Sequence, residues 1–352
     1  MSMSFWDELF ASKKMVIGLS PMDGVTDVAM RYMSAKYGRP DILITEFVSV
    51  DALHHATDDP TLLSASKGHG RRERLLKTFM RAQDVAPLQK RPYEIAQVFG
   101  HTPELFAEAA ELVESLGFDG IDINMGCPMH KVEDQGSGAG LIRTPKLAQE
   151  IIQTVKAHTK LPVSVKTRIG VDRVVVEEWM EQLMEAEPAN ISLHGRTLRQ
   201  LYQGSADWEA IGRAAEVVHK HGGHILGNGD IESVSDLKLK AEKYKVDGGL
   251  IGRAAEGNPG IFLSSVEPSK EQRLAWMIEH ARLYERIFKE ENAYPPSHDE
   301  LRKGTRQERW FLPVRKHLAW YCKGFEGAVE MRSKLMMTNS AEEVVRIVES
   351  AV

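Results

Sequence analysis

The residues best suited to chemistry in this sequence lie at the end of one apolar segment. Residues 121–124 read Ile-Asp-Ile-Asn and run directly into Met-Gly-Cys-Pro at 125–128. Alternating apolar residues predict a strand, and Gly-Cys-Pro predicts that it ends abruptly, which would hold Cys127 at a strand mouth. An unperturbed thiol has a pKa of about 8.5, so at neutral pH it is mostly protonated and can act as an acid. The alternative, a buried cysteine that packs as a small hydrophobic residue, fits this segment alone equally well.

The elements that must position this cysteine repeat along the chain. Eight short apolar segments alternate with segments of helical spacing, such as 103–116, where Thr102 is a candidate N-cap and Pro103 fits the first turn, and 147–158. The candidate strands are 15–20, 41–47, 93–99, 118–124, 162–168, 189–194, 223–228 and 247–252. Strands alternating with helices predict a parallel sheet, and eight of them predict a closed (β/α)₈ TIM barrel of the α/β class.

Candidate site residues, most of them polar, charged or glycine, mark the same end of nearly every candidate strand. They are Pro21 and Met22 after the first, Glu46 at the second, Gln97 in the third, Asn124 and Cys127 at the fourth, Lys166 and Arg168 at the fifth, His194 at the sixth, Asn228, Gly229 and Asp230 at the seventh, and Gly252 and Arg253 at the eighth. Each could be a barrel-capping hydrogen bond, but a ring of them is hard to explain as packing, and catalytic groups of this fold lie at these ends. The glycines of the last two loops would let backbone N–H groups reach a phosphate, with Arg253 supplying charge.

The chain changes character after residue 267. Beyond Glu-Pro-Ser at 267–269 we expect helices only, at 273–289, 309–321 and 341–349, with a connecting loop at 291–305. The sequence therefore predicts a catalytic barrel over residues 1–267 and a smaller all-helical domain over 268–352.

Composition is that of an ordinary soluble protein. The 352 residues are 42% hydrophobic and 27% charged, and no apolar run approaches the roughly 18 residues that a membrane span needs. Residues 1–14 do not resemble a secretory signal. Only two cysteines, Cys127 and Cys322, occur, which favours a reducing cytoplasm over a disulfide scaffold. We expect a cytoplasmic protein, a monomer, with no metal site.

Positive charge is concentrated in two segments although the net charge is −5. Residues 67–91 carry eight basic residues against two acidic ones, and residues 301–323 carry seven against one. The second segment also holds Trp310, Phe311, Trp320 and Tyr321. Either segment could be a solvated helix face, but aromatic residues among positive charges also suit a polyanion whose bases stack on them.

The motifs at the strand ends identify a family. The chain resembles the dihydrouridine synthases, flavoenzymes that act on tRNA, from residue 15 to about 325. The resemblance is carried by Pro21 to Asp27, Asn124 to Pro128 with Lys131 and Val132, Val165 to Arg168, His194 to Thr197 with Tyr202 and Ala206 to Trp208, Asn228 to Asp230, and Gly252 to Ala254. Arg315 and Lys316, with His317, Trp320 and Tyr321, are similar to the family's helical RNA-binding domain. The long basic segment between the second and third strands varies within the family.

The resemblance implies reduction of the C5–C6 double bond of a uridine by FMN, with NADPH or NADH as the reductant. It assigns the cofactor to Pro21, Met22, Gln97, Lys166, His194 and the last two loops. Lys166 would stabilise the charge of the reduced flavin, while Gln97 and His194 would orient the ring. Cys127 would give a proton to C5 after hydride reaches C6.

The resemblance also assigns the substrate. Asn124 would read the uracil edge, Arg168 and Tyr202 would contact the base or a neighbouring phosphate, and Arg315 and Lys316 would bind tRNA. A uridine stacked inside folded RNA must be extruded to reach a barrel mouth, and phosphate contacts on the basic tail would offset that cost. Three alternatives stay open: an FMN-dependent barrel reductase of a small molecule, the same reaction on rRNA, and a non-catalytic RNA-binding protein.

Overall fold

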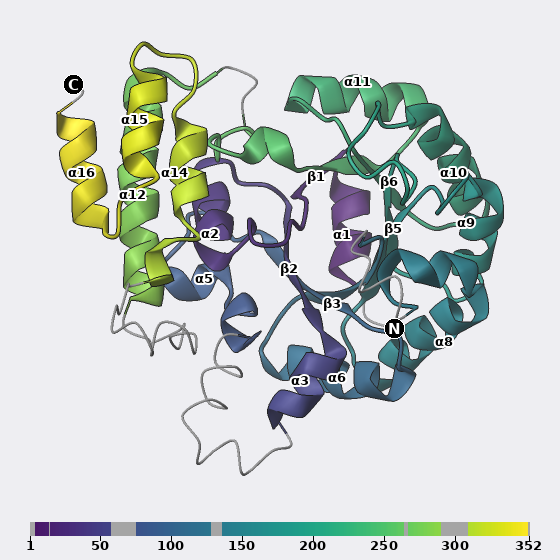
Figure 1. Ribbon diagram of the computed structural model, residues 1–352. Helices are drawn as coiled ribbons and strands as arrows, with labels where there is room; N and C mark the ends of the chain where they lie inside the picture. The colour runs from purple at the N-terminus through teal and green to yellow at the C-terminus, as the bar shows by residue number, and fades with distance from the viewer. Residues whose placement is uncertain are drawn as a thin grey trace.

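Eight parallel strands form a closed barrel in the computed structural model, which describes residues 4–13, 15–57, 75–127, 136–263, 267–289 and 309–350 (Figure 1). The strands are β1 (Val16–Leu19), β2 (Ile42–Ser49), β3 (Tyr93–Phe99), β4 (Gly120–Met125), β5 (Val163–Arg168), β6 (Asn190–His194), β7 (Ile225–Asn228) and β8 (Gly248–Ile251). Each pairs with its neighbour in chain order, and β8 closes on β1. The predicted TIM-barrel fold is confirmed, and every predicted strand overlaps an observed one.

Strand alternation separates the polar residues of the barrel from its apolar shell. In β4, Asp122 and Asn124 share one face of the strand, while Ile121, Ile123 and Met125 alternate with them and join the large apolar core. The register sets Gln97 opposite Asp122 and Asp122 opposite Ser164. Gln97, Asp122 and Ser164 therefore form one polar layer across three strands, and Asn124 and Lys166 form the next layer toward the carboxyl ends.

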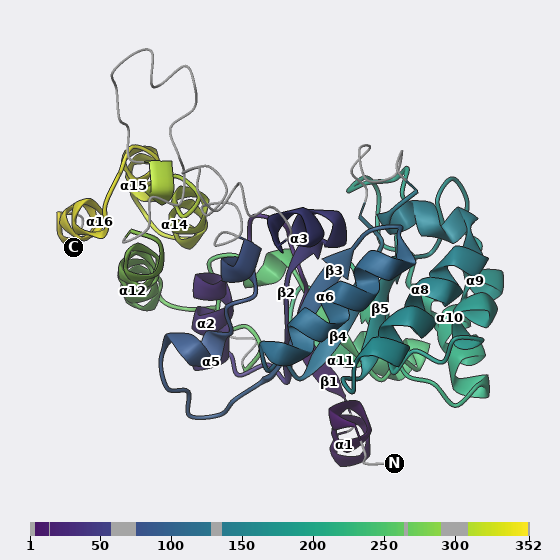
Figure 2. The ribbon, with the colours of Figure 1, turned by 90° about the horizontal axis from the view of Figure 1, so that it is seen from below.

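A helix closes the other end of the barrel. Helix α1 (Phe5–Ser12) begins with a capping box in which Ser4 accepts from the Asp7 N–H and Asp7 accepts from the Ser4 N–H. Its Phe5 and Trp6 join an apolar cluster with residues from the lower part of the strands, and the Phe5 ring stacks on Tyr93. Figure 2 shows α1 at the base of the barrel, below β1. The amino ends of the strands are thus covered, which leaves the carboxyl ends for a site.

Helices between the strands surround the barrel. They are α2 (Val28–Tyr37), α3 (Val50–Thr57), α5 (Ala82–Val85), α6 (Pro103–Ser115), α8 (Pro145–His158), α9 (Val176–Met184), α10 (Trp208–Lys220) and α11 (Val234–Tyr244), with 3₁₀ turns η1 (Gly138–Arg143) and η2 (Arg253–Ala255). The helices predicted at 103–116 and 147–158 are confirmed as α6 and α8. Thr102 is the N-cap residue of α6 and Pro103 lies in its first turn, as predicted, although the Thr102 side chain makes no capping hydrogen bond.

The chain after residue 267 is helical where the structure describes it. Its elements are α12 (Lys270–Phe288), η3 (Arg309–Phe311), α14 (Arg315–Tyr321), α15 (Ala328–Leu335) and α16 (Ala341–Glu349). The single helix predicted at 309–321 is instead split, because Pro313 lacks an N–H and excludes the residue before it from helical geometry. The division into domains at residue 267 stays a prediction.

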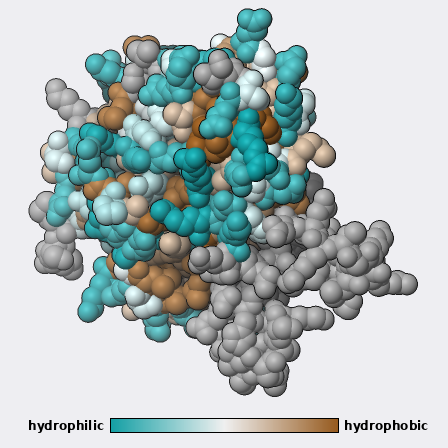
Figure 3. All heavy atoms as spheres, turned by 90° about the vertical axis from the view of Figure 1, so that its left-hand side faces the viewer, coloured by the Kyte–Doolittle hydropathy of each residue, from teal (hydrophilic) through white to brown (hydrophobic). Residues whose placement is uncertain are grey.

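The helices after residue 267, which we call the late helices, lie on one side of the barrel, where α12 packs against α2 (Figures 1 and 2). Lys36 and Tyr37 of α2 contact Glu279 of α12. A Cβ on Gly257 would lie 2.3 Å from the Trp320 carbonyl oxygen, so α14 approaches the barrel too closely for any side chain there. The face of the molecule on the side of these helices is largely hydrophilic, with separate apolar areas (Figure 3). Within the described residues, no helix is both long and apolar enough to span a bilayer.

Candidate active site

The strand ends β5 to β8 bring two cations and an amide into the barrel mouth. The Lys166 Nζ donates to the Asn228 Oδ1 at 3.1 Å, and the Asn228 amide nitrogen donates to the Leu250 carbonyl oxygen at 2.8 Å. The Arg168 guanidinium donates to the carbonyl oxygens of Gly126 at 2.7 Å and Thr197 at 3.2 Å. These bonds fix both cations at the rim between the fourth and seventh strands.

Arg168 is buried and Lys166 is half-buried, and desolvation lowers the pKa of both side chains. Burial, and then the neighbouring Arg168, lowers the pKa of Lys166 to about 8, and burial lowers the pKa of Arg168 to about 10. No carboxylate forms an ion pair with either cation in the part of the chain that the structure describes. A bound group that carries negative charge would therefore be stabilised here.

The end of β4 is organised by two amides. The Gln97 Nε2 donates to Asp122 at 2.7 Å, and its Oε1 accepts from the Asn124 Nδ2 at 3.0 Å. The Asn124 Oδ1 accepts from the backbone N–H groups of Gly126 and Cys127 at 3.0 and 2.9 Å. Cys127 is buried, forms no disulfide, and interacts electrostatically with Lys166 and Arg168. A thiolate formed at Cys127 would be stabilised by these cations.

His194 lies among positive charges at the end of β6. Burial, and then Arg168, Lys166, Arg196 and Arg253, lowers the pKa of its imidazole well below the usual value. The ring is therefore neutral at physiological pH and can donate through one nitrogen and accept through the other. One nitrogen lies 3.4 Å from the Arg196 guanidinium. His194 can thus hydrogen-bond a polar ring edge without adding charge.

The loops after β7 and β8 form a second cluster. Gly229 has a φ of +113°, and a Cβ there would lie 2.8 Å from Ala206 and 2.9 Å from the His194 ring, so only glycine fits. Asp230 accepts from Arg196 at 2.6 Å and from Arg253 at 2.8 Å. Burial alone would raise the pKa of Asp230, but Arg196, the Ala206 N–H and Arg253 hold it below its usual value. The carboxylate thereby orients two guanidinium groups beside a glycine turn.

The opposite rim, at β1 and β2, is acidic. Burial, together with Asp27 and Asp23, raises the pKa of Glu46 to about 8, and burial raises the pKa of Asp27 to about 6. Asp27 also caps α2 by accepting from the Met30 N–H at 2.8 Å. Lys316 of α14 comes close to this rim: a Cβ on Gly24 would lie 2.9 Å from the Lys316 Nζ. The mouth is therefore cationic on one side and acidic on the other.

Of the remaining predicted residues, some lie at the rim of the barrel mouth and one points away from it. Pro21 and Met22 follow β1, and a Cβ on Gly252 would lie 3.4 Å from the Met22 sulfur, so the first and eighth loops meet. Tyr202 is exposed at the rim, with the Arg253 guanidinium 5.8 Å from its ring centre. Arg315 is directed elsewhere, since it donates to Thr338 at 2.7 Å and Asn339 at 2.8 Å within the helical part.

Some predicted residues fall outside the described part of the chain. They are Pro128, Lys131 and Val132 of the motif after β4, the basic residues Lys67, Arg71, Arg72 and Arg74, and Arg302, Lys303 and Arg306. The side chain of Arg309 also lies outside it.

Two residues that the structure places in the site received no role from the sequence. Asp122 stands in the quoted strand motif, and Arg196 in the His-Gly-Arg motif, but their partners come from other strands. Period-two alternation from Asn124 would have placed Asp122 on the same face and could have found it. Nothing local predicts that Arg196 reaches Asp230, which lies 34 positions away.

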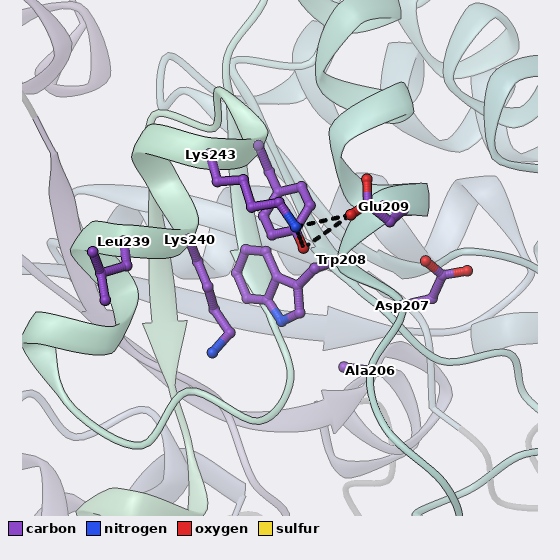
Figure 4. A pocket seen from close by; sticks show the side chains of 8 residues that line it. Ala206, Asp207, Trp208, Glu209, Leu239, Lys240 and Lys243 are labelled. Atoms are coloured by element: carbon purple, nitrogen blue, oxygen red, sulfur yellow. Dashed lines mark hydrogen bonds and ion pairs between the residues drawn. The ribbon is translucent and has the colours of Figure 1, made fainter.

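A separate groove lies outside the barrel, between α10 and α11 (Figure 4). It has a volume of about 410 Å³ and is lined by Trp208, Glu209, Leu239, Lys240 and Lys243, among others. Lys243 donates to Glu209 at 3.0 Å, and the Lys240 Nζ lies 5.6 Å from the Trp208 ring centre. The groove holds none of the cations of the barrel mouth, so the candidate site is the mouth itself.

Comparison with known proteins points to one family. The model of the family described as "Dihydrouridine synthase (Dus)" matches residues 18–352. A probable tRNA-dihydrouridine synthase of Staphylococcus aureus (strain MRSA252) is 35% identical over 347 residues, which cover 97% of this chain and 94% of that protein. Probable tRNA-dihydrouridine synthase 2 of Bacillus subtilis (strain 168) is 35% identical over 348 residues, covering 98% and 95%. Probable tRNA-dihydrouridine synthase 1 of Synechocystis is 31% identical over 341 residues, covering 95% and 85%. The chain belongs to the dihydrouridine synthase family.

Proposed function

We propose that this protein reduces the C5–C6 double bond of uridines in tRNA, with FMN as cofactor and NADPH or NADH as reductant. Its membership of the dihydrouridine synthase family and the names of its relatives support the reaction and the RNA substrate. The observation that carries the cofactor assignment is Lys166, a desolvated cation at the end of β5 that forms no ion pair with a carboxylate among the described residues. Such a cation suits an electron-rich ring that becomes negative on reduction.

The residues of the mouth fit FMN by their chemistry. Lys166 would face the part of the ring that becomes negative, and Gln97 and His194 would hydrogen-bond its polar edge. The turn at Gly229 and Asp230, with Gly252 and Arg253, would hold the phosphate, because glycine turns let backbone N–H groups approach an anion. Pro21 and Met22, where the first and eighth loops meet, would contact the ring face. When bound, FMN would supply the hydride that reaches C6 of the uracil.

Cys127 would supply the proton. Addition of hydride at C6 leaves negative charge on C5 and the C4 carbonyl, and the thiol transfers its proton to C5 on the opposite face. The C5–C6 double bond thus gains one hydride and one proton. The thiolate that remains would be stabilised by Lys166 and Arg168, whose electrostatic interactions with Cys127 are present in the structure, until solvent returns a proton.

The substrate would be held by the rim and by the late helices. Asn124, Arg168 and Tyr202 would contact the extruded base and its neighbouring phosphate, since a uridine must leave its stack to reach the mouth. Lys316, whose Nζ lies close to Gly24, would meet a phosphate near that base. The RNA contact predicted for Arg315 stays a prediction that competes with its hydrogen bonds inside the helical part. The cytoplasmic location and the monomeric state also stay predictions.

The test is to purify the protein, record its visible spectrum, and incubate it with NADPH and unmodified tRNA. We expect flavin absorption bands, release of FMN on denaturation, and a tRNA nucleoside that has gained two hydrogens, seen by mass spectrometry. A protein without flavin, or one that reduces a small enone but leaves tRNA unchanged, would contradict the proposal.

A further inference from the structure

One buried carboxyl beneath the mouth has no role in the reaction described so far. Asp122 of β4 is fully buried and forms no ion pair in the described ranges. Its Oδ1 accepts from the Ser164 hydroxyl at 2.6 Å, and its Oδ2 accepts from the Gln97 Nε2 at 2.7 Å. Burying a carboxyl is costly, and here two hydrogen bonds and the charge of Lys166 only partly offset that cost, so packing alone does not explain the residue.

Asp122 begins a chain of hydrogen bonds that ends at the catalytic cysteine. Gln97 donates to Asp122 and accepts from Asn124, and Asn124 accepts in turn from the N–H groups of Gly126 and Cys127. The links measure 2.7, 3.0, 3.0 and 2.9 Å. Gln97, Asp122 and Ser164 are neighbours across β3, β4 and β5, so the strand register itself holds the chain together.

The two ends of this chain determine the orientation of both amides. An ionised carboxylate can only accept hydrogen bonds, and a backbone N–H can only donate them. With Asp122 charged, Gln97 must turn its NH₂ group toward it and its oxygen toward Asn124. With two N–H groups at the far end, Asn124 must turn its oxygen toward Cys127 and its NH₂ group toward Gln97. Reversing either amide sets donor against donor or acceptor against acceptor in a buried site.

We propose that Asp122 is a positioning residue, which fixes the orientation of Gln97 and Asn124 and thereby the place of the Cys127 backbone. The assignment rests on the proposed function, in which Gln97 contacts the cofactor and Asn124 the base. With its oxygen occupied by two N–H groups, Asn124 offers the base only an N–H donor, which matches a carbonyl oxygen. A neutral asparagine at position 122 accepts a weaker hydrogen bond than a carboxylate and can also turn a donor toward Gln97, so it would hold the two amides less firmly.

The charge of Asp122 should make the rate of reaction with tRNA depend on pH in a specific way. Burial raises the pKa of Asp122 to about 6, against the hydrogen bonds from Ser164 and Gln97 and the charge of Lys166, which lower it. Lys166 of β5 is the titratable side chain that acts on Asp122 from the surrounding strands. Between about pH 6 and 8 the carboxylate is charged, and below about pH 6 it becomes neutral like an asparagine.

The experiment compares wild type with Asp122→Asn, with FMN saturating. Each protein is reduced with NADPH without oxygen, and the rate at which unmodified tRNA reoxidises it is followed from pH 5 to 8. At pH 8 the rate constant for Asp122→Asn should fall roughly ten- to a hundredfold, the scale of a mismatched buried hydrogen bond, with little change in the tRNA concentration for half-maximal rate. The ratio of the two rates should approach one as pH falls below about 6.

Ser164→Ala is the matched control, because it removes a donor from the other oxygen of the same carboxylate. Its rate at pH 8 should fall less than that of Asp122→Asn, since Gln97 still faces a charged acceptor. The Ser164 hydrogen bond lowers the pKa of Asp122, so in Ser164→Ala the inflection in the plot of rate against pH should move to higher pH. Equal rates for wild type and Asp122→Asn at pH 8, or an unmoved inflection in Ser164→Ala, would overturn the assignment.

A second readout needs no RNA. Alkylation of Cys127 by iodoacetamide at pH 8, followed by peptide mass spectrometry with the fully buried Cys322 as internal reference, should be severalfold faster in folded Asp122→Asn. The cause would be release of the backbone that Asn124 holds. An unchanged alkylation rate would contradict the positioning role even if wild type proved inactive on tRNA. That last result would instead contradict the proposed function.

Discussion

Lys166 and Arg168 stand in the barrel mouth without an ion pair to a carboxylate among the described residues, and desolvation lowers the pKa of both side chains. Structural ion pairs perturb pKa values too, but they do so with a partner. His194, close to these cations, is held neutral. Cys127 completes the group as a thiol that could donate a proton and whose anion the two cations would stabilise. In the proposed reaction these four residues would provide the acid, the positive charge and the neutral hydrogen-bonding group.

Cys127→Ala tests the acid directly. The variant should bind FMN and accept electrons from NADPH at the wild-type rate, while dihydrouridine formation falls roughly a hundredfold or more, as expected for loss of a general acid. The two half-reactions are measured separately by flavin absorbance and by nucleoside mass spectrometry. A variant with wild-type turnover on tRNA would remove Cys127 from the mechanism.

Arg253→Ala tests the phosphate site. Loss of a charge-assisted contact worth about 1.5–3 kcal/mol should weaken FMN binding roughly ten- to a hundredfold. Titration of apoprotein with FMN by fluorescence quenching measures the change. Lys243→Ala, which removes an exposed cation of the outer groove, is the control and should leave FMN affinity as it is. Equal affinities for wild type and Arg253→Ala would place the phosphate elsewhere.

At the scale of elements, the eight strands and the polar ring at their ends could be predicted from the sequence because each rests on local pattern. Asn124 and Lys166 stand where strand alternation turns them inward, and the helices α6 and α8 follow from apolar spacing. The split between η3 and α14 was missed although Pro313 signals it. The contacts of Asp122 and Arg315 could not be foreseen, since their partners are distant in sequence and only the register or the helix packing brings them together.

Glu46, inside β2, should make the stability of the fold depend on pH. Its pKa is about 8 in the folded protein, against 4.5 for an exposed glutamate, so between these values the folded state holds the extra proton. Stability should therefore fall as pH rises from about 5 to 8. Glu46→Gln keeps a neutral group there, and its melting temperature should exceed that of wild type at pH 8 and converge with it near pH 5. Thermal unfolding of both proteins, with exposed Glu150→Gln as control, measures this. If the melting temperature of Glu46→Gln exceeded that of wild type by the same amount at every pH, the pKa of Glu46 would not be raised in the folded protein.

At the scale of the whole molecule, the late helices pack directly against the barrel. Helix α12 packs on α2, α14 approaches Gly257, and Lys316 reaches over Gly24 toward the acidic rim. A base that enters the mouth would bring its neighbouring phosphates toward α14. The arrangement explains how a helical appendage on a TIM barrel can present an RNA backbone to a site at the carboxyl ends of the strands.

The adjacent residues Lys316 and Arg315 should separate RNA binding from stability. Lys316→Ala should weaken tRNA binding and reduce the slope of log affinity against log salt by about 0.7–0.9, the value for one phosphate contact, without lowering the melting temperature. Arg315→Ala should lower the melting temperature by several degrees, because it loses the bonds to Thr338 and Asn339. Filter binding at several salt concentrations and thermal unfolding give both quantities. The reverse pattern would assign the RNA contact to Arg315.

The most direct measurement is the reoxidation of the NADPH-reduced protein without oxygen, by unmodified tRNA on one hand and by free uridine on the other. The proposed function predicts that tRNA restores the oxidised flavin spectrum, with one dihydrouridine formed per flavin reoxidised, and that free uridine at the same concentration does not. Reoxidation by free uridine or a small enone as fast as by tRNA, or reoxidation by tRNA without dihydrouridine, would contradict it.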